Sequence, residues 1–213
     1  MEKRKLGQSN IEVSVVGVGC NNFGRRIHDV AVARAVVDRA IDLGITLFDT
    51  ADVYGDGTSE SFLGEAIGKR RAQVVIATKF GWGSPSGASR RTIARTVEAS
   101  LKRLRTDYID LYQVHYPDPN TPIEETLRAL DDLVRDGKVR AIGCSNFSGT
   151  QVSAALDTSA RTGTAAFVTC QDEYSLLVRK IERELGWRAS VTFEEGIERT
   201  VAWYRDHVDS IRE

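Results

Sequence analysis

The sequence predicts an α/β protein of the (β/α)8, TIM-barrel type that is incomplete: six βα units follow an N-terminal hairpin, and a helix comes last. Strand-like and helix-like segments alternate six times after the hairpin. The strands are short and apolar throughout, which is typical of a parallel sheet buried on both faces. An open doubly wound sheet is the alternative. The glycines of GVGCNNFG, at positions 17, 19 and 24, lack the spacing of its phosphate-binding turn, which favours the barrel.

The first half of the chain supplies the hairpin and three units. KRKL and IEVSV flank the turn signal GQSN and predict the hairpin. Ala33, Val37 and Ile41 fall on one face of the helix that follows the first strand, and Gly44 ends that helix. We therefore expect strands over 15–20, 45–50 and 73–80, and helices over 30–43, 59–68 and 89–104.

The second half contains the best-marked helix. Thr121 is expected to cap its first turn, with Pro122 at the first helical position and Glu124 completing a capping box. Gly137 ends this helix. The other expected elements are strands over 108–116, 139–145 and 165–171, and a weaker helix over 148–160.

The composition is ordinary for a globular protein and argues against several classes of protein, such as nucleic-acid-binding and membrane proteins. A net charge of −1, with both signs interspersed, favours neither nucleic acid nor an anionic membrane as a partner. No apolar run approaches the ~20 residues of a membrane span, and the N-terminus lacks the apolar core of a secretion signal. Cys20, Cys144 and Cys170 show no metal-ligand spacing. We expect reduced, buried cysteines, no metal and a cytoplasmic location.

Four polar residues fall at the ends of consecutive expected strands. Asp49 closes the second strand and Tyr54 lies in the loop after it, while Lys79 closes the third strand and His115 the fourth. Each alone has a structural explanation, such as a loop cap or a core histidine. Active sites of barrels lie where strands end, so together they predict one catalytic cluster.

The chemistry expected of this cluster is proton delivery to a carbonyl oxygen. An unpaired buried lysine would cost several kcal/mol, so we expect Lys79 to pair with Asp49. The ammonium is then expected to lower the pKa of Tyr54 from about 10, which makes the phenol a general acid. His115 is expected to orient the substrate oxygen.

Residues 1 to about 180 resemble the aldo-keto reductase family. The similar segments are KRKLGQSNIEVSVVGVGC, FDTADVYGDGTSESFLGEAI, VVIATKF, LYQVHYPD, VRAIGCSNF and QDEYSLL. The resemblance implies reversible reduction of aldehydes or ketones, a small carbonyl substrate, and NADPH or NADH as the cofactor. It implies the same catalytic residues: Asp49, Tyr54, Lys79 and His115.

The resemblance also implies a site for the nicotinamide carboxamide. Ser145 and Asn146, in GCSN, and Gln171, in QDEY, occupy the positions that hold this group in the family. Asp172 stands where the family usually has asparagine.

Residues 181–213 depart from that family. No seventh or eighth apolar strand follows Leu177, and the family's basic segment for the cofactor phosphates is not recognisable. ELGWRASVTFEEGIERTVAWY resembles instead the C-terminal end of nucleotide-sugar dehydratases and epimerases of the extended short-chain dehydrogenase family. We expect residues 1–180 to form the partial barrel and 181–213 a loop and helix of different origin.

The C-terminal helix is expected to be amphipathic. Thr192 and Glu195 predict a capping box, and the apolar stripe is Ile197, Val201, Tyr204 and Val208. The helix is expected to cover the opening left in the barrel or to form a dimer contact, rather than to bind substrate.

An unclosed sheet exposes two edges of unpaired backbone groups. Three outcomes are open: a sheet covered by the tail, self-association through the edges, or marginal stability. The functional alternative to a reductase is a non-catalytic or impaired scaffold that lacks the cofactor phosphate site. A nucleotide-sugar enzyme is favoured only by the tail.

Overall fold

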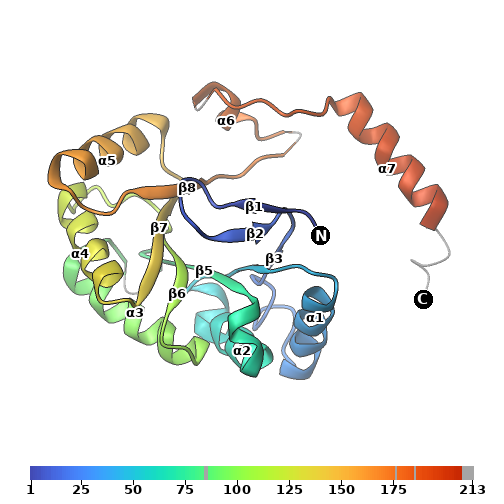
Figure 1. Cartoon of the computed structure of the whole chain (residues 1–213), viewed down its shortest axis with the longest axis horizontal. Helices are drawn as coiled ribbons and strands as arrows, with labels where there is room; N and C mark the ends of the chain where they lie inside the picture. Colours follow the sequence, from blue (N-terminus) through green and yellow to red (C-terminus); the bar gives the residue numbers. More distant parts are fainter. Residues whose placement is uncertain (84–85, 176, 185, 208–213) are drawn as a thin grey trace. The chain divides into compact units, whose positions relative to one another are not determined.

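The computed structural model describes residues 1–83, 86–175, 177–184 and 186–207. These residues form two compact units, Met1–Asp172 and Glu173–Glu213. A parallel sheet forms the centre of the first unit and curls as a partial barrel wall (Figure 1). Strands that are adjacent in this sheet also follow one another in the sequence. This arrangement confirms the predicted fold class. The strands are β3 (Gly17–Gly19), β4 (Leu47–Asp49), β5 (Val75–Phe80), β6 (Ile109–Val114), β7 (Val139–Ser145) and β8 (Phe167–Gln171).

Helices cover the outer face of this sheet (Figure 1). Phe48, Ile76 and Tyr112 point outward from adjacent strands and belong to the main apolar cluster, which also contains the inner stripes of the helices. This continuous core explains why the strands read as apolar along their length. The helices are α1 (Val30–Asp42), α2 (Thr58–Ile67), α3 (Arg90–Leu104), α4 (Ile123–Arg135) and α5 (Gly149–Thr162), with two short 3-10 helices, η1 (Tyr54–Gly57) and η2 (Gly68–Gln73).

Side chains before three helices accept hydrogen bonds from the first turn. Asp29 caps α1, Ser89 caps α3, and Ser148 forms a full capping box with Gln151 at the start of α5. The prediction that Thr121 caps α4 is wrong. Thr121 Oγ1 donates to Asp118 Oδ2 at 2.6 Å instead. Helix α4 begins at residue 123, one residue later than predicted, with Pro122 as its N-cap.

The inner face of the sheet has an apolar layer near the amino-terminal ends of the strands. Ala77, Leu111 and Ala141 form a second cluster on neighbouring strands. The hairpin of β1 (Lys3–Lys5) and β2 (Glu12–Ser14) covers this layer with Leu6 and Ile11. The hairpin therefore removes apolar side chains from water at this end of the sheet.

Two contacts fix the position of the hairpin. Ser14 and Thr46 exchange hydrogen bonds of 2.9 Å, each backbone N–H donating to the other residue's hydroxyl, which ties β2 to the segment before β4. At the turn, Gly7 has a φ of +55°, and a Cβ placed there would lie 2.0 Å from the carbonyl oxygen of Val168 in β8. The hairpin thus contacts the sheet both beside β4 and at the edge strand β8.

A buried carboxylate anchors the amino-terminal ends of β5, β6 and β7. Asp110 is only 1% exposed, and it accepts hydrogen bonds from Arg71 at 2.7 Å, Arg140 at 2.9 Å and the N–H of Ile76 at 3.0 Å. The two guanidinium groups also lie 4.0 and 3.9 Å from the ring centroid of Tyr108. Paired in this way, the carboxylate avoids the cost of an uncompensated buried charge.

The second unit contains α6 (Lys180–Glu184) and α7 (Phe193–His207). The N–H of Glu195 donates to Thr192 Oγ1 at 3.2 Å, so Thr192 caps α7 as predicted. Val208, the last residue of the expected stripe, lies outside the described residues. Among the helices that the structure describes, none has the length and apolar character needed to cross a membrane.

Gly7→Ala should destabilise the fold much more than Gly163→Ala. Both positions have a positive φ, which costs about 1–2 kcal/mol for a residue with a Cβ. A Cβ at Gly163 would meet nothing within 4 Å, whereas one at Gly7 would collide with the backbone of β8. Urea unfolding of the two variants measures the difference. Equal losses would show that the hairpin does not pack against β8.

Candidate active site

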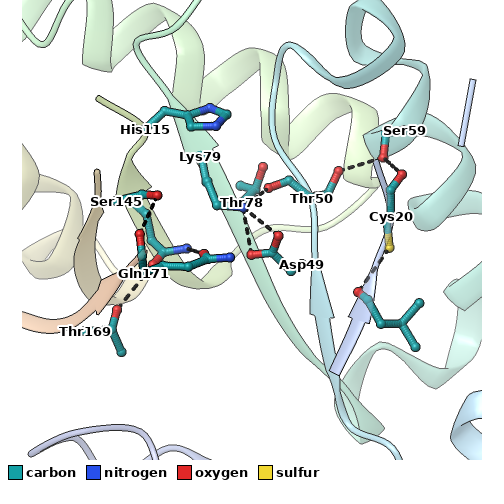
Figure 2. A network of polar contacts seen from close by, with 12 residues as sticks. Cys20, Asp49, Thr50, Ser59, Thr78, Lys79, His115, Ser145, Thr169 and Gln171 are labelled. Carbon is teal, nitrogen blue, oxygen red and sulfur yellow. Dashed lines mark hydrogen bonds and ion pairs between the residues drawn. The ribbon is translucent and has the colours of Figure 1, made fainter. Parts of the chain in front are cut away.

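The carboxyl ends of three adjacent strands and one loop bring the four predicted residues together. Asp49 ends β4, Lys79 lies in β5, and His115 follows β6, its N–H donating to the carbonyl of Phe80 at 2.9 Å. Tyr54 begins η1, in the loop after β4. Figure 2 shows Lys79 between the carboxylate of Asp49 and the ring of His115.

The ammonium of Lys79 is the buried charge of this cluster. The residue is 2% exposed, and its Nζ donates to Asp49 Oδ1 at 2.6 Å, Asp49 Oδ2 at 2.8 Å and the carbonyl of Thr50 at 3.1 Å. The expected ion pair with Asp49 therefore forms. An ammonium has three N–H donors, and these three acceptors use all of them.

Tyr54 lies beside this ion pair, but its pKa does not move in the expected direction. Lys79 Nζ is 5.4 Å from the centroid of the Tyr54 ring. Burial, followed by the negative charge of Asp49, raises the pKa of Tyr54 to about 12. The prediction that Lys79 lowers this pKa is wrong for this structure, because burial of the phenol and the negative charge of Asp49 dominate. Tyr54 therefore keeps its proton at neutral pH.

The backbone after Tyr54 is in an unusual conformation. Gly55, Asp56 and Gly57 all have positive φ, at 56°, 53° and 86°. A Cβ on Gly55 would lie 3.0 Å from the carbonyl oxygen of Phe23, so this turn packs closely against the loop after β3. The run of left-handed residues lets η1 turn sharply and holds the tyrosine over the end of the sheet.

The ring of His115 lies within contact range of three other aromatic rings at the site. Its ring lies 5.8 Å from that of Tyr54, 5.1 Å from Trp82 and 5.4 Å from Tyr116, between centroids. Burial and the charge of Lys79 lower the pKa of His115 to about 4. The imidazole is therefore neutral near pH 7. Its buried Nδ1 has no hydrogen-bond partner among the described residues.

Ser145, Asn146 and Gln171 form a second group at the ends of β7 and β8. Ser145 Oγ donates to the carbonyl of Gln171 at 2.7 Å (Figure 2), and Asn146 Nδ2 donates to the carbonyl of His115 at 2.9 Å. Asn146 has a φ of +61°, which asparagine tolerates better than most residues. The side-chain oxygen of Gln171 accepts from Gln113 Nε2 at 3.1 Å.

A family model described as "Aldo/keto reductase family" matches residues 15–188 of the chain. The chain belongs to the aldo/keto reductase family. The match ends beyond residue 180, where the resemblance was expected to stop.

Named relatives agree with this assignment. The chain is 42% identical over 195 residues to "Aldo-keto reductase YhdN" of Bacillus subtilis, an alignment that covers 87% of the chain and 57% of the relative. It is 37% identical to a "Probable voltage-gated potassium channel subunit beta" of Arabidopsis thaliana, covering 86% and 58%. It is 35% identical to "Versiconal hemiacetal acetate reductase" of Aspergillus parasiticus, covering 87% and 62%. The chain thus spans about three fifths of the length of these relatives.

In this member of the aldo/keto reductase family, a hydroxyl network supports the cluster from the side of α2. Thr50 and Ser59 hydroxyls lie 2.8 Å apart, and Ser59 Oγ donates to the carbonyl of Cys20 at 2.7 Å (Figure 2). The N–H of Cys20 donates to the carbonyl of Asp49 at 2.8 Å. The network connects the ends of β3 and β4 to α2, which fixes the carboxylate that Lys79 needs.

Sequence reasoning missed Gln113, Trp82 and Tyr116. Gln113 lies two residues before His115, so strand alternation places both side chains on the inner face. Trp82 and Tyr116 each lie two residues after a strand end, where side chains reach the site. Period-two alternation and position in the loops were the available signals.

Asp52 is a partly buried carboxylate near the cluster. Its N–H donates to the carbonyl of Lys79 at 3.0 Å, while its buried Oδ1 has no hydrogen-bond partner in the part of the chain that the structure describes. Burial, then the charge of Glu60, raise the pKa of Asp52 from 3.8 to about 7. The ionised form of Asp52 is therefore unfavourable in the folded state.

Asp49→Asn should destabilise the protein, because the Lys79 ammonium would stay buried beside a neutral amide. We expect a loss of about 3 kcal/mol, the low end of the range for breaking a buried ion pair. The Asp49→Asn/Lys79→Met double variant should lose less than the sum of the single variants. Urea unfolding checks this cycle. Strict additivity would mean that the pair does not stabilise the fold.

Asp52→Asn should stabilise the protein more at pH 8 than at pH 5. The cost of ionising Asp52 starts above its unfolded pKa, near 3.8, and is complete above its folded pKa of about 7. The variant therefore gains most where the wild type is fully ionised. Melting temperatures at both pH values measure the gain. The exposed Asp56→Asn is the control, and a pH-dependent gain as large as that of Asp52→Asn would contradict the prediction.

Proposed function

We propose that the chain catalyses NAD(P)H-dependent reduction of aldehydes or ketones to alcohols. The observation that carries this proposal is the buried Lys79–Asp49 pair with Tyr54 and His115 around it, at the carboxyl ends of neighbouring strands. Barrel enzymes place their catalytic groups at this end. Two relatives are also named as reductases.

In this proposal Tyr54 is the general acid. Its pKa of about 12 makes it a weak donor to a ground-state carbonyl. The oxygen of a carbonyl that is receiving hydride becomes alkoxide-like and approaches the basicity of hydroxide, whose conjugate acid, water, has a pKa of about 15.7. Proton transfer from Tyr54 to that oxygen is favourable, so protonation follows the developing charge.

His115 is the proposed orienting group. Its pKa of about 4 keeps the imidazole neutral, and a neutral imidazole has one N–H to donate to a carbonyl oxygen. The rings of Trp82 and Tyr116 restrict its orientation from two sides. The Lys79–Asp49 pair keeps the adjacent surface close to neutral, which suits an uncharged substrate.

Ser145, Asn146 and Gln171 are the proposed contacts of the nicotinamide carboxamide. The cofactor, NADPH or NADH, supplies the hydride. The residues fit an amide, because hydroxyl and amide groups converge between β7 and β8. Gln171 Nε2 has no acceptor among the described residues, while its oxygen is fixed by Gln113. That N–H group can donate to the oxygen of a carboxamide.

The alternative is a non-catalytic or impaired aldo/keto reductase scaffold. The raised pKa of Tyr54 favours this alternative, as does the likeness to a protein named as a potassium channel subunit. The different origin of residues 181–213 and self-association through β3 and β8, the edges of the described sheet, stay predictions. Sedimentation at several concentrations tests the second.

Tyr54→Phe should reduce aldehyde-dependent oxidation of NADPH by at least 100-fold, in line with the loss of a general acid. Binding of NADPH, followed by fluorescence, should change little. Lys79→Met should also abolish turnover, with circular dichroism to verify folding. Tyr108→Phe, before β6 at the opposite end of the sheet, is the matched control and should keep wild-type rates.

Three results separate the candidate functions. Turnover that depends on Tyr54 supports the reductase. NADPH binding without turnover in the wild type supports the scaffold. Wild-type rates in Tyr54→Phe or Lys79→Met would exclude the proposed proton donor.

A further inference from the structure

Two of the three cysteines lie opposite each other on neighbouring strands. Cys144 in β7 and Cys170 in β8 are register partners in the parallel sheet. Both side chains pack in the main apolar cluster, which also contains Phe147 and Phe167, so they point to the same face. Neighbouring strands lie about 4.8 Å apart. This spacing is within the range of about 4.4–6.8 Å between Cα atoms that a disulfide can bridge.

The Cys144 thiol donates to the carbonyl of Thr169 in β8 at 3.7 Å, so it points toward the neighbouring strand. The neighbouring Cys170 thiol, followed by burial, raises the pKa of the Cys144 thiol. Cys170 Sγ in turn lies 3.3 Å from Asp172 Oδ2, to which it donates. Cys144 is buried, whereas Cys170 is partly exposed. An external reagent therefore meets Cys170 first, and Cys144 can react next from its position beside it.

We propose that Cys144 and Cys170 are a dithiol that a low-molecular-weight disulfide oxidises to an intramolecular disulfide. The Cys170 thiolate attacks one sulfur of the small disulfide, which releases one small thiol and leaves a mixed disulfide on Cys170. Cys144 then attacks Cys170 Sγ and displaces the second small molecule as a thiolate, which takes up the proton that Cys144 loses. The two protein thiols lose two electrons and two protons, and the small disulfide is reduced to two thiols.

The consequence for activity rests on the proposed function. Ser145 directly follows Cys144, and Gln171 directly follows Cys170, so the disulfide would form one residue away from two proposed cofactor contacts. Figure 2 shows Ser145 and Gln171 side by side at the strand ends. Oxidation also removes the thiol proton that Cys170 donates to Asp172, the residue after Gln171. We therefore expect NADPH to bind several-fold more weakly to the oxidised protein.

The crosslink is tested on the full chain with oxidised glutathione, by intact mass and peptide mapping. The expected product has lost two hydrogens, links Cys144 to Cys170, and is reversed by dithiothreitol. Cys20→Ser, which removes the third thiol, should give the same product. Cys144→Ser should stop at a glutathione adduct on Cys170. A wild-type protein that stops at this adduct, or that links Cys20, overturns the proposal.

Phenylarsine oxide gives a second test that needs no variant. This reagent binds two thiols at once, so it should bind the reduced wild type in a 1:1 ratio and protect both Cys144 and Cys170 from alkylation. Protection of neither cysteine contradicts the dithiol.

NADPH titration of the reduced, oxidised and re-reduced protein tests the effect on the site. Weaker binding that returns on reduction supports it, and equal affinities overturn it. Failure of the reduced protein to bind NADPH would instead count against the proposed function, and the crosslink assays would be unaffected.

Discussion

The fold at the carboxyl end of the sheet depends on the need to pair one buried ammonium. Lys79 is almost fully covered, so each of its three N–H groups requires an acceptor, and all three acceptors come from Asp49 and Thr50 at the end of β4. Strand β4 is only three residues long, and the ion pair extends its attachment to β5. The backbone continues this attachment, since the N–H of Thr50 donates to Ala77 and that of Asp52 to Lys79. Tyr54 is positioned two residues later, at the end of this series of contacts.

The same pairing determines the electrostatics of the site. Burial and the carboxylate of Asp49 dominate at the phenol, so Tyr54 is harder to ionise. Lys79 affects His115 differently, because its positive charge opposes a second cation and adds to burial. Both proton-bearing groups are therefore neutral near pH 7. A site of this kind holds its protons until a strongly basic oxygen forms, which matches proton transfer coupled to hydride delivery.

Much of this arrangement could be predicted because strand ends are marked in the sequence. Apolar runs that stop at Asp49, Lys79 and His115 are sufficient to place three side chains at one end of a parallel sheet. The direction of the Tyr54 pKa could not be predicted, because it depends on the burial of the phenol and on the negative charge of Asp49. The start of α4 was also missed: Asp118 competes for the hydroxyl of Thr121, and a spacing rule for caps does not include that competitor.

The inner face of the sheet shows why the proposed chemistry is confined to one end. At the amino-terminal end the apolar layer is covered by the hairpin. At the level of Asp49, its register partner in β3 is Gly19, and a Cβ at that glycine would meet nothing within 4 Å. Two positions earlier, a Cβ at Gly17 would already lie 3.1 Å from Leu47. The position of Gly17 is therefore narrowed by Leu47, whereas the absence of a side chain at Gly19 leaves open space on the strand next to Asp49. This open space and the paired charges lie at the same level of the sheet.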